Sequence, residues 1–421
     1  FLKKGIYTMP QFLLERFDNR VRTGLAVFWL LVYIFINLTS VIYLGALAIN
    51  TITGIKLVYA ILGLAAFSAL YSIYGGLKAV AWTDVIHVVF LIGGGLMTTY
   101  LALNAISGGE GFITGFKELL QEAPQKFDMI LSSSHPNYHE LPGITVIVGG
   151  MWIANLNYWG FNQYIIQRGL AAKSIREAQR GLVFAGYLKL LIPLIVVIPG
   201  ICAFVLNAGI DKPDEAYPWL LDNFVFTGLK GIAFAALIAA VVSSLSSMIN
   251  STSTIFTMDI FKTYMNKQAN EQILVRTGRI VSGIALIIAV LVAPQLRTLE
   301  QAFQFIQEFT GFVSPGVVAI FLTGLFWKKA TSNAALWAVI ATIPLSFVFK
   351  FLTPEMGFLN RMGLVFLLLC LLIFIISSIE RKHEDPKAIK VSKGMFHTGT
   401  RFNVGAIGIM VILAALYAIF W

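Results

Sequence analysis

The chain has 421 residues, of which 57% are hydrophobic and only 12% are charged. Soluble domains carry about 25% charged residues, so this composition excludes a water-soluble enzyme and indicates a membrane protein. The formal net charge of +10 does not indicate a nucleic-acid partner, because the Lys and Arg residues are not gathered into one basic patch.

Eleven runs qualify, or nearly qualify, as membrane spans, which need about 20 mostly apolar residues. A β-barrel would show alternating segments of about ten residues instead, so the predicted fold class is an all-α membrane protein. Cys202 and Cys370 lie inside apolar runs and indicate packing rather than a disulfide or a metal site. The predicted spans are 24–49, 57–77, 79–106, 142–167, 181–207, 229–260, 279–297, 299–327, 332–352, 361–379 and 403–421.

The basic residues predict the orientation of these spans. Most Lys and Arg residues fall in the connections on one side of the membrane, and this side is predicted to be cytoplasmic by the positive-inside rule. The N-terminus then lies inside and Trp421 outside. The external segment 107–141 is predicted to carry a surface helix at 116–120, and the basic connection 168–180 suits an inner face near anionic lipid.

Asp84 lies in the span 79–106, about one and a half turns from its predicted cytoplasmic end. A carboxylate at that depth needs a partner. His87, three residues further on, is the candidate that the local sequence offers, together with water.

The span 142–167 carries two glycines followed by a run of polar side chains. Glycines followed by amides are typical of an interrupted helix at a midplane substrate site. A packed helix whose amides bond neighbouring helices is the alternative. The residues are Gly149 and Gly150, then Asn155, Asn157, Tyr158, Asn162 and Gln163, with Trp152 and Trp159 among them.

Lys189 is a basic residue well inside a predicted span, roughly 12 Å from its cytoplasmic start. Its ammonium offers three donors to hydroxyls or carbonyls, although a structural ion pair is also consistent. In the span 299–327, Phe303 and Gln307 stand four residues apart, so a ring and an amide point the same way. That pair suits a sugar, which offers apolar C–H faces and hydroxyls; an ordinary amphipathic helix end is the alternative.

The span 229–260 begins with small residues and continues with many hydroxyl side chains. Ala240, Ser243 and Ser244 stand at i, i+3 and i+4, which places one carbonyl and two hydroxyls on one face. Uncharged oxygens of this kind can ligate sodium, although a serine-rich helix also serves as packing.

Several strings of the sequence resemble the sodium:solute symporter family, and the resemblance runs over essentially the whole chain. The strings are Thr8-Met-Pro-Gln-Phe-Leu-Leu-Glu-Arg16, Tyr71-Ser-Ile-Tyr-Gly-Gly-Leu-Lys-Ala79, Asn155-Leu-Asn-Tyr-Trp159, Asn162-Gln-Tyr-Ile-Ile-Gln-Arg168 and the serine-rich segment Ser243 to Ile260. The resemblance implies a bundle of five-plus-five inverted repeats that transports a solute with sodium by alternating access. The protein would be a multi-pass transporter of the plasma or inner membrane and not an enzyme.

The resemblance also implies roles for individual residues. Asn155, Lys189 and Gln307 would bond the sugar, while Tyr158, with Trp159 beside it, would close the inner gate and Phe303 would belong to the outer gate. The Ala240 carbonyl and the Ser243 and Ser244 hydroxyls would form half of a sodium site. A second cation site would consist of Asp84, Ser246 and Ser247, because the resemblance places their spans side by side.

The N-terminus departs from the family pattern, in which a leading helix and two core helices precede the Thr-x-Pro segment. We therefore expect one transmembrane domain, 1–421, with three helices missing, incomplete sites and no transport by this chain alone. Residues 24–106 would be the remainder of the first repeat, 142–327 the second repeat and 332–421 peripheral helices.

Sodium-coupled symport of a hexose, glucose or galactose, is the leading functional hypothesis. The alternatives are another solute, such as myo-inositol, sialic acid or proline, or a sugar sensor or leak channel on the same scaffold. The expected partners are a sugar, sodium and the lipid bilayer, whereas the sequence does not predict the oligomeric state.

Overall fold

The structure is a computed structural model whose regular elements, in the described part of the chain, are all helices. Nine described helices are long and apolar enough to cross a membrane, which confirms the all-α membrane fold. The description omits residues 3–4, 7, 140–142, 226, 300, 381–382, 391–393 and 395, and the side chains of 71, 73–81, 136, 139 and 227.

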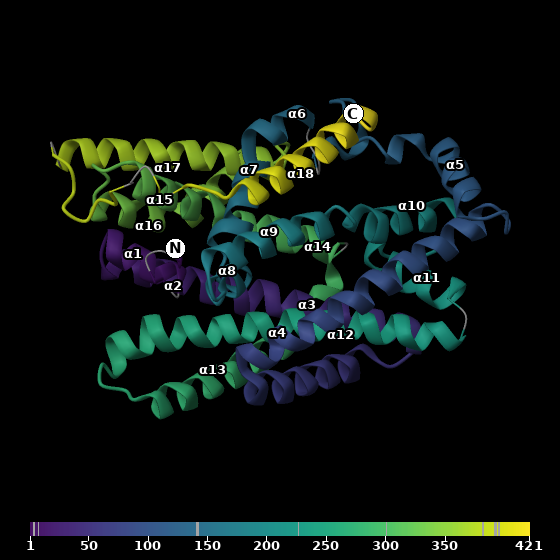
Figure 1. The fold of residues 1–421 in the computed structure, drawn as a ribbon, viewed down its shortest axis with the longest axis horizontal. Coiled ribbons are helices and arrows are strands. Elements are labelled where there is room, and N and C mark those ends of the chain that lie inside the picture. Colours follow the sequence, from purple (N-terminus) through teal and green to yellow (C-terminus); the bar gives the residue numbers. More distant parts are fainter. Residues whose placement is uncertain are drawn as a thin grey trace.

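The helices run mostly along the long axis of the molecule, so their connections gather at its two ends (Figure 1). The N-terminus and the turn between α12 and α13 lie at the left end, whereas α5 and α11 lie at the right end. The sequence placed these two groups on the cytoplasmic and the external side, respectively, so the arrangement agrees with the predicted topology.

The first long helical segment of the bundle, a rod of residues 19–53, is built from three consecutive helices. Asp18 starts it, because its carboxylate accepts hydrogen bonds from two backbone amides of the first turn, which a helix start leaves unpaired. The rod ends at Gly54, whose φ of 72° suits a glycine. Its elements are α2 (Asn19–Leu31), the π-helical η2 (Val32–Leu38) and α3 (Thr39–Thr53), preceded by α1 (Met9–Arg16).

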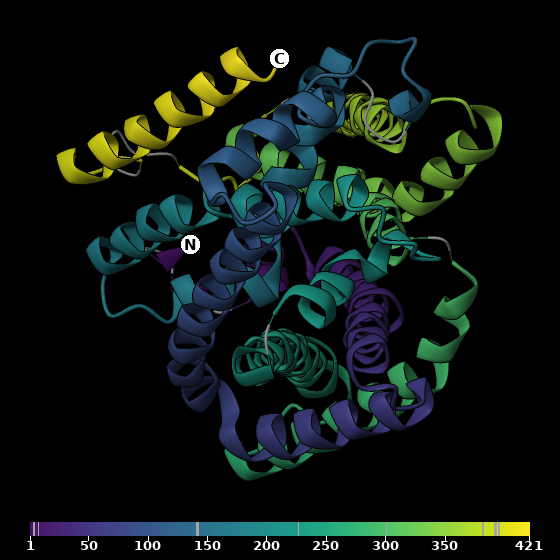
Figure 2. The same ribbon diagram turned by 90° about the vertical axis from the view of Figure 1, so that its right-hand side faces the viewer.

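The predicted spans 57–77 and 79–106 form one helix, α4 (Leu57–Ile106). The prediction of a connection at residue 78 was therefore wrong, because the helical backbone continues through it. Figure 2 shows the two arms of α4 running in different directions. The first arm, Leu57–Leu70, is apolar but shorter than a full span, which partly explains why nine such helices stand against eleven predicted ones.

The predicted span 142–167 is also not one regular helix. It is divided into α6 (Gly143–Val146), the π-helical η5 (Ile147–Met151), α7 (Trp152–Leu156), the π-helical η6 (Asn157–Phe161) and α8 (Gln163–Leu170). The helical course breaks at Asn162, whose backbone is extended with φ −82° and ψ 121°. The expected interruption is present, but it lies beyond Gly149 and Gly150.

These two glycines serve close packing instead. A Cβ atom on Gly150 would lie 1.9 Å from the Leu359 carbonyl oxygen, and one on Gly363 would lie 3.1 Å from the Gly149 Cα atom. Only glycine permits so close an approach between this segment and α17.

The helices that complete the chain pack around these elements. α12 packs along α4 and α13, and α18 lies beside α9. The predicted surface helix at 116–120 is part of α5. The remaining bounds are α5 (Phe112–Glu122), η3 (Pro124–Lys126), η4 (Pro136–His139), α9 (Ile175–Lys189), η7 (Pro193–Val197), α10 (Ile198–Val205), η8 (Pro213–Glu215), α11 (Ala216–Phe224), α12 (Thr227–Ile255), η9 (Phe256–Met265), α13 (Glu271–Val292), η10 (Ala293–Thr298), α14 (Ala302–Gly311), α15 (Ser314–Phe326), α16 (Ser332–Leu352), α17 (Phe358–Glu380) and α18 (Thr400–Ile419).

Candidate functional site

The break at Asn162 is fixed by hydrogen bonds to the first part of the chain. The Tyr33 hydroxyl on η2 donates to Oδ1 of Asn162 at 2.6 Å. The next residue, Gln163, accepts from the Met9 amide at 2.9 Å. All four residues are buried, so these bonds form away from water, where an unpaired polar group is costly. The interrupted helix is therefore held in a defined place.

Three of the predicted sugar-binding residues meet beside this break. Tyr158 and Trp159 lie on η6 with their rings edge to face, 5.0 Å between centroids. Lys189, the last residue of α9, places its Nζ atom 4.1 Å from the centroid of the Trp159 ring. A cation over an indole face is attracted by the ring electrons, so the ammonium is held next to the aromatic pair.

The Tyr158 hydroxyl also has a partner on the far side of the break. Tyr164, on α8, donates its hydroxyl proton to Tyr158 at 2.9 Å. This bond spans the interruption, so a movement of α8 would directly displace Tyr158 at the predicted gate.

Asn155 lies one turn before Trp159, on α7, and is exposed. Its Nδ2 atom donates to the Met151 carbonyl at 2.9 Å. One N–H and the carbonyl oxygen of the amide make no hydrogen bond within the described part of the chain, so both are available to a ligand hydroxyl.

Phe303 and Gln307 lie on a different helix, α14, and both are exposed. The start of α14 is held by Asp214, whose Oδ2 atom accepts from the Ala302 amide at 2.8 Å. Among the described residues, no hydrogen bond or ring contact joins Phe303 or Gln307 to the Lys189–Trp159 pair. The structure thus brings Tyr158, Trp159 and Lys189 into contact, with Asn155 one turn earlier in the same segment.

The predicted sodium ligands on α12 are divided between two neighbours. Ala240 and Ser244 line a mainly apolar cavity of about 490 Å³ that also reaches Asp214. Ser243 is directed to α4, where its hydroxyl donates to Oδ1 of Asp84. A hydroxyl that donates its proton keeps its lone pairs, so this bond leaves Ser243 able to ligate a cation.

Asp84 has a stronger partner than the one its local sequence offers. Arg168, at the end of α8, donates from Nε to Oδ2 of Asp84 at 3.0 Å and from Nη2 to the Ser247 hydroxyl at 2.6 Å. The His87 Nδ1 atom lies 4.0 Å from Oδ1 of Asp84. The guanidinium therefore neutralises the carboxylate within a cluster of Asp84, Arg168, Ser243 and Ser247.

Ser246, which the sequence predicted as a ligand of a second cation, has a different environment from Ser243 and Ser247. It is fully buried, and its hydroxyl has no hydrogen-bond partner among the described residues. Its carbonyl accepts from the Ser72 hydroxyl at 3.4 Å. A buried hydroxyl without a partner in the described part of the chain, one residue before Ser247, is an available oxygen ligand.

Sequence reasoning overlooked two contributors to this region, Tyr33 and Arg168. Tyr33 is a phenol within an apolar span, and such a polar group signals a partner elsewhere in the bundle. Arg168 was counted with the basic cytoplasmic connections, so its role in pairing Asp84 was not anticipated.

Known proteins resemble this chain along most of its length. A profile described as the sodium:solute symporter family matches residues 1–342. A sodium/glucose cotransporter from Vibrio parahaemolyticus is 52% identical over 440 residues, covering 100% of this chain and 81% of that protein. An uncharacterized symporter, YidK, from Escherichia coli (strain K12) is 32% identical. The match covers 99% of this chain and 74% of that protein.

A mammalian relative and a solved structure extend the comparison. The sodium/myo-inositol cotransporter 2 of Oryctolagus cuniculus is 33% identical over 83% of this chain, which spans 56% of that protein. A solved structure of a Na⁺-coupled sialic acid symporter, in a substrate-bound, outward-open state, superposes with a TM-score of 0.76 and 23% sequence identity. The match covers 90% of this chain and 79% of that chain. This likeness shows a shared fold.

Proposed function

The chain belongs to the sodium:solute symporter family, and from this premise we propose that it takes up a hexose, glucose or galactose, together with sodium by alternating access. The observation that supports a sugar as the solute is the position of the Lys189 ammonium over Trp159, beside the Tyr158 ring at a broken helix. A charged donor next to aromatic faces matches a ligand with hydroxyls and apolar C–H faces. The identity with a sodium/glucose cotransporter supports the same solute.

The sugar site in this proposal has two sides. Asn155 and Lys189 donate hydrogen bonds to sugar hydroxyls from the broken helix and from α9, and Gln307 does so from α14. Tyr158 stacks on the sugar and closes its path to the cytoplasm, while Phe303 closes the external path. In this proposal the two sides hold the sugar between them, and the alternating-access movement opens and closes them in turn.

The sodium site uses the Ala240 carbonyl with the Ser243 and Ser244 hydroxyls. Asp84 assists without touching the ion, because it accepts the Ser243 proton and so aims the oxygen lone pairs of that hydroxyl away from itself. Sodium entering through a potential of about 100 mV and a tenfold gradient supplies about 3.7 kcal/mol per ion. That energy is sufficient for several-hundredfold accumulation of a sugar.

A second cation at Asp84, Ser246 and Ser247 remains part of the proposal. Arg168 already neutralises Asp84 and bonds Ser247, so a sodium ion would have to displace this guanidinium. The displaced arginine would release the end of α8 from α12, and α8 directly follows the gate segment. The second ion would in this way be linked to the movement of the gate.

Uptake into proteoliposomes tests the function. Protein expressed from the complete gene should accumulate labelled galactose only with an inward sodium gradient, and unlabelled glucose should compete. Competition by myo-inositol alone would assign the solute of the rabbit relative instead. Downhill flux of sugar without sodium dependence would indicate a leak channel and contradict the proposal.

A further inference from the structure

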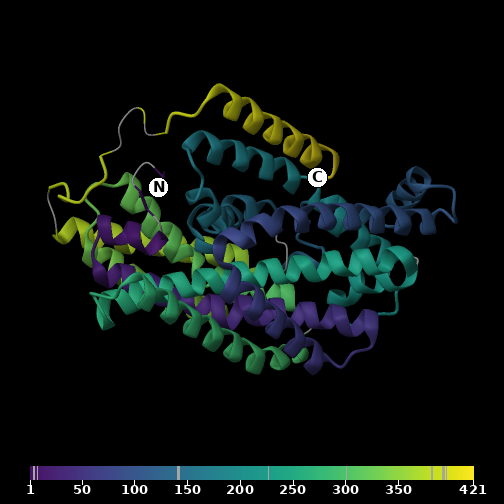
Figure 3. The same ribbon diagram turned by 60° about the horizontal axis from the view of Figure 1, so that its bottom comes forward.

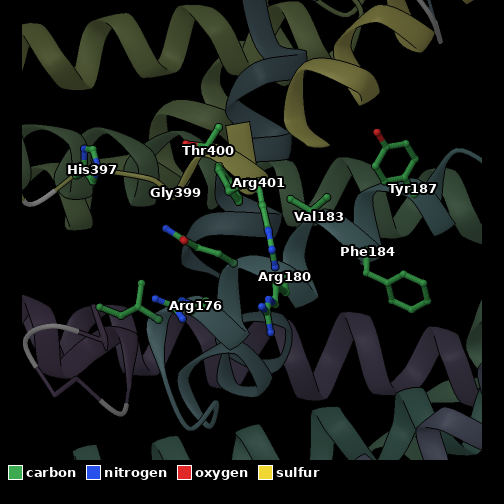
Figure 4. Close-up of a pocket in the computed structure, with 12 residues that line it drawn as sticks. Arg176, Arg180, Val183, Phe184, Tyr187, His397, Gly399, Thr400 and Arg401 are labelled. Carbon is green, nitrogen blue, oxygen red and sulfur yellow. The ribbon is translucent and has the colours of Figure 1, made fainter. Parts of the chain in front are cut away.

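A basic groove lies where the predicted cytoplasmic ends of α9 and α18 separate. It has a volume of about 770 Å³ and is lined by α9 between Ile175 and Tyr187 and by residues 397–402 at the start of α18. Arg176, Arg180 and Arg401 all line it. Figure 4 shows Arg401 reaching from α18 toward Arg180 on α9.

The positive charge in this groove is not balanced. Arg180 pairs with Glu177 at 3.0 Å, but both side chains are more than half exposed, so water weakens that pair. Arg176 and Arg401 form no ion pair or hydrogen bond with the described residues. No Asp or Glu is among the residues that line the groove. Like charges directed into one space favour the binding of an anion there.

Apolar side chains also line the groove, and a hydrogen bond joins its two helices. Phe184 lines it with 64% of its surface exposed, and Phe402 lines the opposite side. The Tyr187 hydroxyl donates to the Gly405 carbonyl at 3.1 Å, which fastens α18 to α9 at the groove. Figure 3 shows this helix pair side by side at the edge of the bundle, where lipid would have access.

We propose that the groove binds an anionic phospholipid of the cytoplasmic leaflet. Arg176, Arg180 and Arg401 hold its phosphate, and its acyl chains lie against Phe184 and the exposed apolar face of α18. A free phosphate ion would make no use of these apolar walls, whereas basic sites between membrane helices at the cytoplasmic face suit acidic headgroups. The lipid would tie α18 to α9, the helix that ends at Lys189.

Native mass spectrometry measures this binding on the full chain in a non-ionic detergent. We expect one tightly held palmitoyl-oleoyl phosphatidylglycerol molecule, and about thirtyfold weaker binding by the double variant R176Q/R401Q, because each basic side chain near an acidic headgroup contributes about fivefold. Each single variant should lose about fivefold. Both arginines are exposed, so these single changes keep the test valid if the double variant does not fold.

A control double variant at another place distinguishes lipid binding in the groove from general attraction of the lipid to a basic surface. K262Q/R276Q removes two exposed cations from the same predicted face, on η9 and α13, and should bind lipid like the unchanged protein. Equal losses in both double variants would overturn the proposal. Displacement of the lipid by millimolar inorganic phosphate, or equally tight binding of phosphatidylcholine, would overturn it as well.

Discussion

The Lys189 ammonium lies 4.1 Å from the Trp159 ring centroid, where it can donate to a sugar hydroxyl. Lys189→Ala should lower the apparent affinity for sugar roughly 10- to 100-fold in the full-length protein, because hydrogen bonds from a charged donor contribute about 1.5–3 kcal/mol. Uptake of labelled galactose over a range of concentrations measures this loss.

The control for that prediction is Lys173→Ala, which removes an exposed lysine from the connection before α9. It should leave uptake unchanged. An unchanged apparent affinity in Lys189→Ala would show that the lysine has a structural role and does not bind the sugar.

The Tyr158 ring and its hydroxyl can be separated by a second comparison. Tyr158→Phe should impair transport less than Tyr158→Ala, because a ring that closes the gate by stacking acts through its face. Tyr164→Phe removes the same tyrosine–tyrosine hydrogen bond from the other side, so it should match Tyr158→Phe. Sugar transport kinetics measure all three variants; equal losses in Tyr158→Phe and Tyr158→Ala would mean that the hydroxyl matters and the stacking does not.

At the scale of elements, the polar run of 142–167 predicted an interrupted helix, and the structure contains one. The place of the break could not be predicted, because glycine serves both an unwound turn and a close helix contact. Gly150 packs against the Leu359 carbonyl, whereas the extended residue is Asn162. Its stabilising partner, Tyr33, is more than a hundred residues away in sequence, and local patterns do not show such a pairing.

Asp84 illustrates the same limit. Its sequence neighbour His87 was the candidate partner, but Arg168 holds the carboxylate. A charged residue in a span signals that a partner exists; which one it is depends on how α4, α8 and α12 pack together. The sequence alone therefore could not identify Arg168 as the residue that pairs with Asp84; the packing of the three helices was needed to show it.

The start of α14 carries a pH-dependent contact. Burial raises the pKa of Asp214 above its usual value of 3.8, although the Ala302 amide partly opposes the shift. The folded state thus holds the proton more tightly than the unfolded state, so this group lowers the stability as the pH rises from 3.8 through the raised pKa.

Asp214→Asn keeps an acceptor for the Ala302 amide and cannot ionise. We expect its melting temperature in detergent to depend less on pH across that mildly acidic window than that of the unchanged protein. Asp211→Asn, which removes an exposed carboxylate nearby, should keep the original dependence. Parallel pH profiles for Asp214→Asn and the unchanged protein would contradict this account.

At the scale of the whole molecule, the family fold and the transport function followed from composition, span pattern and motifs. The division into repeats at 24–106 and 142–327, with peripheral helices at 332–421, remains a prediction. An alternating-access movement would then act on α8 and α12, which the Arg168 cluster joins through Ser243 and Ser247 in the middle of α12.

The coupling ratio tests whether that cluster also serves as an ion site. A second sodium would add about 3.7 kcal/mol of drive and square the attainable sugar accumulation. It would require the buried Ser246 hydroxyl, which has no partner among the described residues, and a carboxylate released by Arg168. We therefore expect a ratio of two sodium ions per sugar in the full-length protein and one in Ser246→Ala.

The reversal potential of the sugar-coupled current gives this ratio directly. Ser40→Ala is the matched control, because Ser40 is an equally buried serine on α3 whose hydroxyl also has no partner among the described residues, and it should leave the ratio at two. A ratio of one sodium per sugar both before and after the Ser246 change would exclude Asp84, Ser246 and Ser247 as ion ligands. The Asp84–Arg168 pair would then be a structural link between α4 and α8, and sodium would bind only through the site of Ala240, Ser243 and Ser244.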